Sequence, residues 1–86
     1  MPRISQFGGI AIYLYYRDHP PPHFHAIQGE YEAVVEIATA QKLEGRLPRA
    51  AWSVVKKWAA AHRAELLQNW DLARAGQPLN PIAPLT

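Results

Sequence analysis

The chain has 86 residues, no cysteine and a formal net charge of +2 at neutral pH. This length suits one core, so we expect residues 1–86 to form a single domain. The lack of cysteine excludes disulfides and thiolate metal sites, which leaves histidine and carboxylate side chains as the candidate metal ligands. No apolar run approaches the roughly 20 residues of a membrane-spanning helix, and the N-terminal sequence MPRISQFGG lacks the regions of a signal peptide. We therefore expect a cytoplasmic protein with no membrane partner.

Alternating apolar residues predict strands in the first half of the chain. The first strand is expected from Ile10 to Arg17, where every second side chain is apolar and points the same way. The prolines at positions 20–22 end this strand, because proline has no N–H to donate to a sheet. Further strands are expected at residues 23–27, 30–38 and 43–47. Together they predict an antiparallel meander of about four strands over residues 10–47.

The turn at residues 28–29 is expected to join the second and third strands, since glycine supplies the positive φ of a tight hairpin. A two-residue turn there would place His25 opposite Glu32 and Ala26 opposite Tyr31. One sheet face would then be apolar and form the core. The other face would collect polar and aromatic side chains and is the candidate functional face: Tyr13, Tyr15, Arg17, His23, His25, Glu32 and Glu36.

After Pro48 the apolar period becomes helical. Apolar residues recur every three or four positions from Trp52 to Ala73, which predicts one long C-terminal helix over about residues 48–75, packed on the core face of the sheet. At 1.5 Å per residue it would span about 40 Å, so a bend near residues 61–63 is expected. The Pro-rich tail, GQPLNPIAPLT, is expected to be extended. The predicted fold class is therefore α+β.

The segment DHPPPHFH, residues 18–25, contains three of the four histidines of the chain. His23 and His25 are two positions apart, so on a strand both project from one face and can reach a single ion. With His19 and one carboxylate they have the composition of a zinc, iron or manganese site, which makes a divalent transition metal the candidate cofactor. The alternative is structural. His25 and Glu32 would then form a cross-strand ion pair worth under about 1 kcal/mol, and the prolines would only direct one strand into the next.

Positive charge is concentrated in the second half of the chain. On one continuous helix, four basic residues would fall within a sector of about 40° beside the apolar stripe. Such a row is a candidate contact surface for nucleic acid or a partner protein, although it is more often a solvated helix edge. The four residues are Arg49, Lys56, Arg63 and Arg74. Within the stripe, His62 is expected to be a core histidine, and Trp58 is expected at the edge and partly exposed.

The chain contains the segments MPRIS, FGGIAIY, DHPPPHFH, GEYEA, LEGRLP, WAAAHRAELLQNW and PIAPL. Together these resemble the bacterial domain-of-unknown-function family 4160, with DHPPPHFH as the most specific element. The resemblance implies a small stand-alone protein, frequently encoded beside another small protein in an arrangement similar to toxin–antitoxin gene pairs. It assigns no catalytic residue. The positions that match the family pattern are His19, Pro21, Pro22, His23, His25, Trp58, His62, Leu66 and Trp70.

Three functions remain open at this point. The first is a small regulatory or binding module, similar to one half of a toxin–antitoxin pair, whose partner is the protein of a neighbouring gene or nucleic acid. The second is a metal-dependent or histidine-based hydrolase, including an RNase, that uses His19, His23 and His25. The third is a structural protein that forms a homo-oligomer. No nucleophile, base and oxyanion stabiliser can be assembled from the sequence, so we favour the first function and leave enzymatic activity open.

Overall fold

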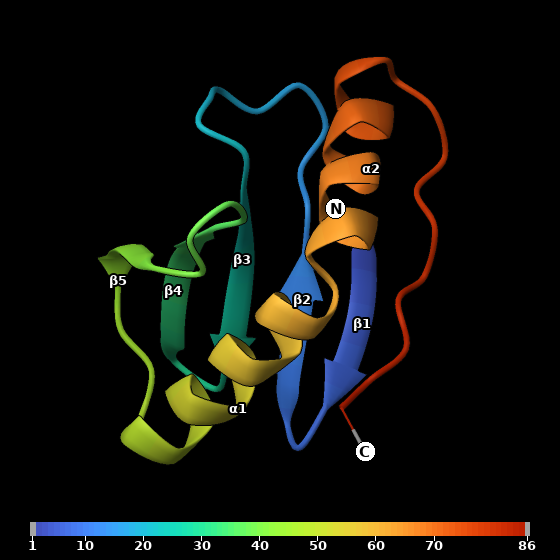
Figure 1. The fold of residues 1–86 in the computed structure, drawn as a ribbon. Coiled ribbons are helices and arrows are strands. Elements are labelled where there is room, and N and C mark those ends of the chain that lie inside the picture. The colour runs from blue at the N-terminus through green and yellow to red at the C-terminus, as the bar shows by residue number, and fades with distance from the viewer. Residues whose placement is uncertain (1, 86) are drawn as a thin grey trace.

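The chain folds as a five-stranded antiparallel sheet with two helices on one face, as a computed structural model shows for residues 2–85 (Figure 1). The α+β class expected from the sequence is confirmed. The strands lie side by side in chain order. Their bounds are β1 Arg3–Phe7, β2 Ile10–Tyr13, β3 His23–Gln28, β4 Tyr31–Glu36 and β5 Lys42–Gly45, and the helices are α1 Arg49–Ala61 and α2 Arg63–Arg74. No helix in the described part of the chain is long and apolar enough to cross a membrane.

The sheet has one strand more than the sequence predicted, because β1 pairs with β2. Gly8 and Gly9, both at positive φ, form the two-residue turn between them. The pairing register of β1 shifts at Ile4 and Ser5, which are neighbours and are both buried. This shift breaks the alternation by which strands are recognised in a sequence. At its other end β2 stops at Tyr13, so the predicted extension to Arg17 is wrong.

Strands β3 and β4 pair two residues away from the predicted register. Gly29 and Glu30 form the turn, and His25 lies opposite Val34 while Ala26 lies opposite Ala33. The predicted pairing of His25 directly opposite Glu32 is therefore wrong. A shift of two residues leaves each side chain on its predicted face, because side chains on a strand alternate with a period of two. The apolar face is accordingly the core, and its β3 and β4 members Phe24, Ala26, Ala33 and Val35 are fully buried.

The predicted single helix over residues 48–75 is wrong, since His62 separates α1 from α2 with φ −117° and ψ 27°. The break falls within the segment where a bend was expected. A straight helix of about 40 Å would overhang the body of the protein, whose longest extent is 34 Å. Figure 1 shows that α1 crosses the strands obliquely, whereas α2 turns to run more nearly along them. Both helices thereby keep apolar residues against one small sheet.

Trp58 forms the centre of the core between α1 and the sheet. Its ring lies 5.4 Å from the ring of Phe7 and 5.7 Å from that of Phe24, measured between centroids. The side chain is fully buried, so the expected partial exposure of Trp58 is wrong. The reason is the C-terminal tail, which covers the edge of the helix: Nε1 of Trp58 donates a hydrogen bond to the carbonyl of Ala83 at 2.9 Å.

The tail, residues 75–85, contains no helix or strand and is held by specific hydrogen bonds. The buried side chain of Asn69 in α2 donates to the carbonyl of Asn80 and accepts from its N–H, both at 2.8 Å. The N–H of Ile82 donates to the carbonyl of Ile4 in β1, and Ile82 is buried. The tail therefore connects α2, α1 and β1.

Candidate metal centre

The candidate site lies on the open face of the sheet, where β3 begins. His23 and His25 are two positions apart in β3 and project from this face, as their sequence spacing predicted. The loop before β3 reverses at Arg17, which has a positive φ of 57°, and so returns Asp18 toward the strand. The carbonyl of Pro22 accepts a hydrogen bond from the N–H of Ile37, which fixes the end of the loop to the chain just after β4.

Asp18, His23 and His25 converge on one point. Oδ2 of Asp18 lies 2.8 Å from Nε2 of His23 and 3.5 Å from Nε2 of His25. One ligand atom from each of the three residues lies within 4.8 Å of the others. Two imidazoles and a carboxylate at this spacing are a donor set that suits zinc, iron or manganese.

The second ring nitrogen of each histidine is already bonded to an oxygen atom. Nδ1 of His23 donates to the carbonyl of Pro21 at 2.6 Å, and Nδ1 of His25 donates to Oε2 of Glu32 at 2.9 Å. These bonds fix the ring orientations, so that Nε2 of each histidine faces Asp18. Histidines that bind metals are typically held in this way, by a carbonyl or carboxylate on the nitrogen remote from the metal.

One polar atom of the cluster has no hydrogen-bond partner. Nε2 of His25 is buried, and its nearest acceptor among the described residues is Oδ2 of Asp18 at 3.5 Å, which is long for a hydrogen bond. Leaving a buried polar atom unpaired typically costs about 1–3 kcal/mol, so such atoms are uncommon in folded proteins. Because this nitrogen faces the Asp18 carboxylate, a cation between the two atoms would satisfy both.

The environment of Nε2 of His23 also favours a cation in the cluster. Both ring nitrogens of His23 face oxygen acceptors, the Pro21 carbonyl and the Asp18 carboxylate. A neutral ring has only one N–H to donate. A neutral ring can therefore donate to only one of these two oxygens, and a cation held between Nε2 and Asp18 would satisfy the other contact.

The cluster is shielded from solvent and its rings are fixed by packing. The side chains of His23, His25 and Asp18 are 4%, 15% and 16% exposed. The ring of Tyr15 meets that of His25 edge-on at 4.4 Å, and Trp70 of α2 lies 5.3 Å from His23. Burial raises the pKa of Tyr15, and the nearby Glu32, Tyr13 and Asp18 raise it further. Tyr15 therefore contributes a neutral ring that orients His25.

Asp18 is held in its charged form. Burial would by itself raise the pKa of this carboxyl, but the N–H of His19 bonds to Oδ1 at 2.8 Å and His23 bonds to Oδ2. These contacts outweigh burial, and the pKa of Asp18 lies below its usual value. The carboxylate is thus ionised at neutral pH, as a metal ligand must be.

A hollow of about 100 Å³ adjoins the cluster. A water molecule takes about 30 Å³ of liquid volume, so the hollow has room for an ion together with one or two small ligands. Val34 and Leu43 make part of its lining apolar, and Glu44 contributes a charged side chain to it. The lining residues are Asp18, His19, Pro21, His23, His25, Val34, Leu43 and Glu44.

His19 lies at the rim and not among the converging ligands. Its side chain is 83% exposed, and Nδ1 contacts the other oxygen of Asp18, Oδ1, at 3.0 Å. Its ring is 5.5 Å from that of His23. The group of converging ligand atoms contains Asp18 where the sequence had suggested His19. The signal for Asp18 was its place beside the prolines, which return it to the strand.

The other residues of the predicted functional face have different roles. Tyr13 stacks on Tyr15 with 6.4 Å between ring centroids, and Glu32 holds His25. Glu36 accepts a hydrogen bond from the hydroxyl of Thr39 at 2.7 Å and takes no part in the cluster. The guanidinium of Arg17 turns away toward Gly76, just after α2.

The four predicted basic residues do not form one row, because the helix breaks at His62. Arg49 and Lys56 lie exposed on α1. Nε of Arg63 donates to the carbonyl of Ile37 at 3.4 Å, and Arg74 lies in the last turn of α2. The prediction that all four residues share one sector of about 40° on a continuous helix is therefore wrong.

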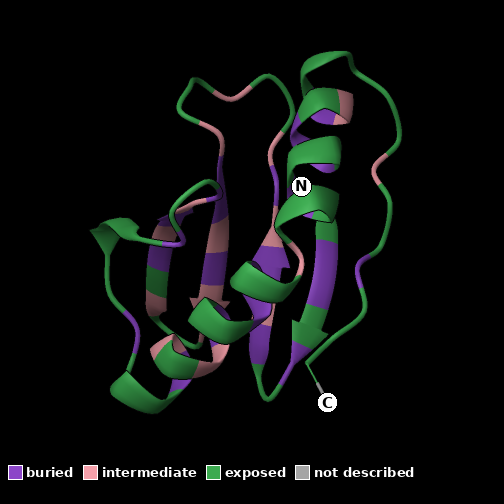
Figure 2. Cartoon of the chain, viewed as in Figure 1, coloured by how far each residue is buried: buried purple, intermediate pink, exposed green. Residues whose placement is uncertain are grey.

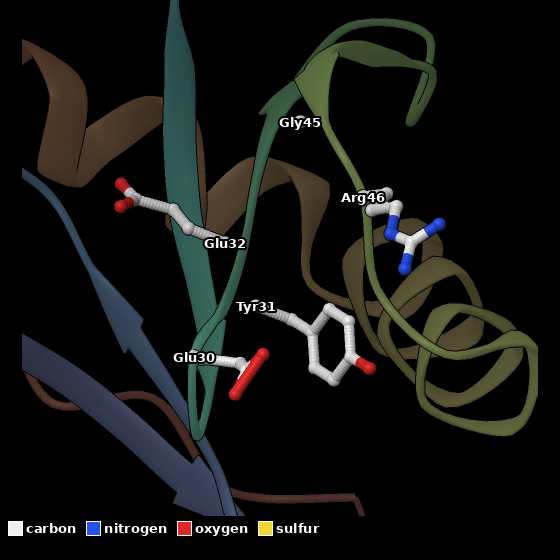
Figure 3. A pocket seen from close by; sticks show the side chains of 5 residues that line it. All are labelled: Glu30, Tyr31, Glu32, Gly45 and Arg46. Carbon is white, nitrogen blue, oxygen red and sulfur yellow. The ribbon is translucent and has the colours of Figure 1, made fainter.

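A second, more open hollow lies beside the β3–β4 turn and is lined by Glu30, Tyr31, Glu32, Gly45 and Arg46 (Figure 3). The guanidinium of Arg46 lies over the ring of Tyr31, 5.4 Å from its centroid. Figure 3 shows that the Glu32 carboxylate points away from this pair. Glu32 thus contributes its charge to the histidine cluster, and the second hollow is a packing feature around Tyr31.

Two helices packed on the core face of the sheet and a histidine–aspartate cluster where β3 begins define a small α+β protein with a candidate metal centre. The chain belongs to the family described as Domain of unknown function (DUF4160), whose model matches residues 9–71. The match includes all three clustered residues and Glu32. No curated protein and no solved structure matches the chain. The resemblance noted in the sequence is thus confirmed at the level of the family, which brings no activity with it.

Proposed function

We propose that this chain is a small module that binds one divalent transition-metal ion through Asp18, His23 and His25. The observation that supports the proposal is the convergence of three ligand atoms within 4.8 Å while both Nδ1 atoms are bonded to oxygens elsewhere. The buried Nε2 of His25 also lies 3.5 Å from Oδ2 of Asp18, a separation that leaves this nitrogen poorly paired and that a shared cation would fit.

Local charge also favours a cation at this place. Glu32 bonds to His25, and Glu44 lines the adjoining hollow. Together with Asp18 these carboxylates surround the cluster with negative charge. A divalent ion would neutralise it, since opposite charges attract strongly where water is partly excluded.

The experiment is a calorimetric titration of the metal-free protein with zinc and manganese, and with cobalt followed by absorption. The wild type is expected to bind one ion per chain. Asp18→Asn and His25→Ala should each weaken binding at least about tenfold, by loss of a ligand. His62→Ala is the matched control, because His62 lies at the junction of α1 and α2 and contacts Glu65, and it should bind as the wild type does. Equal affinity in all four proteins, or no binding by the wild type, would refute the proposal.

A second candidate function is docking of a partner protein at β5, as expected for one half of a toxin–antitoxin-like pair. It is supported by the position of β5 at the edge of the sheet, where all four of its residues are exposed and Leu43 is 44% exposed (Figure 2). An edge strand offers unpaired backbone groups to which another strand can bind.

Co-expression with the product of the neighbouring gene tests this candidate. A complex that survives purification with the wild type and is lost with Leu43→Lys would support docking at β5. Leu67→Lys, on the exposed side of α2, is the control and should keep the complex. No complex with the wild type would remove the candidate, and a dimer of the protein alone in solution scattering would favour the self-associating alternative.

The hydrolase alternative uses the same residues as the metal proposal. Catalytic zinc sites typically have three protein ligands and one position for water or substrate, and the cluster supplies three ligands. It requires metal-dependent hydrolysis, of RNA or another substrate, that Asp18→Asn abolishes. Metal binding without such activity would leave the binding module as the function.

A further inference from the structure

The outward face of α1 carries positive charge, and the helix itself contains no acidic residue. The helix contains three basic residues, Arg49, Lys56 and Lys57, and no aspartate or glutamate. All three are exposed. The acidic residues of the first half of the chain lie in the sheet and its loops, including Glu32 and Glu44 around the candidate metal centre. The two layers of the protein therefore differ in charge.

Small side chains separate the two lysines on the exposed side of α1. At 100° per residue, the exposed positions from Lys56 through Arg49, Ala60 and Ser53 to Lys57 span a sector of about 100°. Ser53 and Ala60 lie between the two lysines and form with them an open hollow of about 290 Å³. The buried side of the helix, with Val55 and Trp58, faces the core. A ligand can thus approach the helix backbone closely between two ammonium groups.

We propose that this face of α1, defined by Arg49, Ser53, Lys56, Lys57 and Ala60, binds the phosphodiester backbone of a nucleic acid. Lysine and arginine supply the charge, and the Ser53 hydroxyl supplies a neutral hydrogen bond of the kind made to phosphates. The inference is independent of the proposed metal function, because α1 packs on the opposite face of the sheet.

An acidic protein is the other polyanion that such a face attracts, and the composition of the face disfavours it. Protein interfaces have a buried core enriched in aromatic and large apolar side chains. The large exposed apolar residues of the described chain are Tyr16, Leu43, Leu67 and Leu85, and none of them lies on α1. Backbone phosphates need no apolar contact, so the basic and polar residues of this face are sufficient to bind them.

Nucleic-acid binding through three cations has a characteristic salt dependence. Each neutralised phosphate releases a counterion, and the logarithm of the binding constant falls with the logarithm of the salt concentration. Three contacts give a slope of about −2 for a single strand and about −2.7 for duplex DNA. The sequence of the nucleic acid should matter little, since backbone contacts carry no base information.

The test is fluorescence anisotropy of the full chain with labelled single-stranded RNA, single-stranded DNA and duplex DNA of arbitrary sequence, between 50 and 200 mM salt. The variant is Lys56→Glu with Lys57→Glu, two exposed positions whose substitution leaves the core intact. The control is Arg3→Glu with Lys42→Glu, which changes the net charge equally at exposed positions of β1 and β5. The α1 variant should lose at least tenfold in affinity, and the control less than threefold.

The three nucleic acids separate the sources of the phosphate. Similar affinity for RNA and DNA would support recognition of the backbone alone, and a tenfold preference would identify which nucleic acid is bound. Equal losses in the two double variants would overturn the proposal, because net charge and not α1 would then control binding. So would the absence of binding at 50 mM salt, or equally tight binding of polyglutamate that displaces the nucleic acid.

Discussion

Nε2 of His23 lies 2.8 Å from Oδ2 of Asp18, and the loop that joins these residues contains three consecutive prolines. The same ring donates from Nδ1 to the carbonyl of Pro21, which belongs to that loop. The proline segment therefore sets both the position of the carboxylate and the orientation of the ring. The stiffness of this segment, which would otherwise only connect two strands, preorganises two of the three proposed ligands.

Glu32→Gln is expected to weaken metal binding about tenfold without unfolding the protein. The amide keeps the size of the side chain but loses the charge that holds Nδ1 of His25, and loss of such support costs about 10- to 100-fold in metal affinity. Glu36→Gln is the control on the same strand and the same face, where the carboxylate bonds to Thr39. Calorimetry on both variants checks this, and equal affinities would contradict a supporting role for Glu32.

His19→Ala is expected to leave metal affinity within about twofold of the wild type, because His19 is not among the converging ligand residues. His25→Ala, by contrast, removes a ligand and should lower the affinity tenfold or more. His19 is 83% exposed, so its removal should not disturb folding. Cobalt absorption spectra of the two variants give the comparison. A large loss with His19→Ala would instead restore the three-histidine site that the sequence suggested.

Zinc is expected to raise the melting temperature of the wild type and to raise that of Asp18→Asn by clearly less. A ligand that binds only the folded state stabilises it by about 2.7 kcal/mol at a free concentration of 100 times its dissociation constant. Thermal unfolding followed by circular dichroism, with zinc and then with excess chelator, measures the shift. A rise of the same size in both proteins would show that zinc acts at another place.

Gly45→Ala is expected to destabilise the protein by more than about 2 kcal/mol, beyond the cost of its positive φ alone. A Cβ at this position would lie 2.0 Å from the backbone oxygen of Glu32, and φ is +73°. Gly29→Ala is the control, because φ there is +58° but nothing lies within 4 Å of the added atom. Its cost should be about 1–2 kcal/mol. Urea unfolding of the two variants gives the loss of unfolding free energy for each. An equal loss in both would contradict a steric contribution at Gly45.

The two faces of the sheet could be predicted from the sequence, although the register could not. Alternation identified Phe24 and Ala26 as core and His23 and His25 as the open face, and a register error of two residues preserves both assignments. The bond between His25 and Glu32 also survives the error. It runs diagonally across the strands, and long side chains reach a diagonal neighbour.

What the sequence did not reveal depends on tertiary structure. β1 was missed because Ile4 and Ser5 are both buried, although Gly8-Gly9 between Phe7 and Ile10 is a hairpin signal that could have revealed it. The helix break at His62 was not fixed by glycine or proline. The break allows both helices to cover a small sheet, and the size of the sheet cannot be predicted from a local sequence pattern.

Only part of the candidate site could be predicted, because the path of the loop before β3 depends on tertiary structure. Strand spacing brought His23 and His25 together, but the return of a loop cannot be calculated from alternation. The sharp turn at Arg17 placed Asp18 against the two rings and left its neighbour His19 in solvent. Adjacent residues in a loop can thus have opposite roles, and only the path of the backbone distinguishes them.

The bond from Ile82 to Ile4 has a consequence for how these molecules can associate. The C-terminal segment covers one border of the sheet and leaves the other, at β5, open. A sheet open at both borders can add neighbours on each side and grow into fibres, whereas one with a single open border stops after one addition. With residues 75–85 along the β1 border, β5 is the border of the described sheet that remains available for strand pairing.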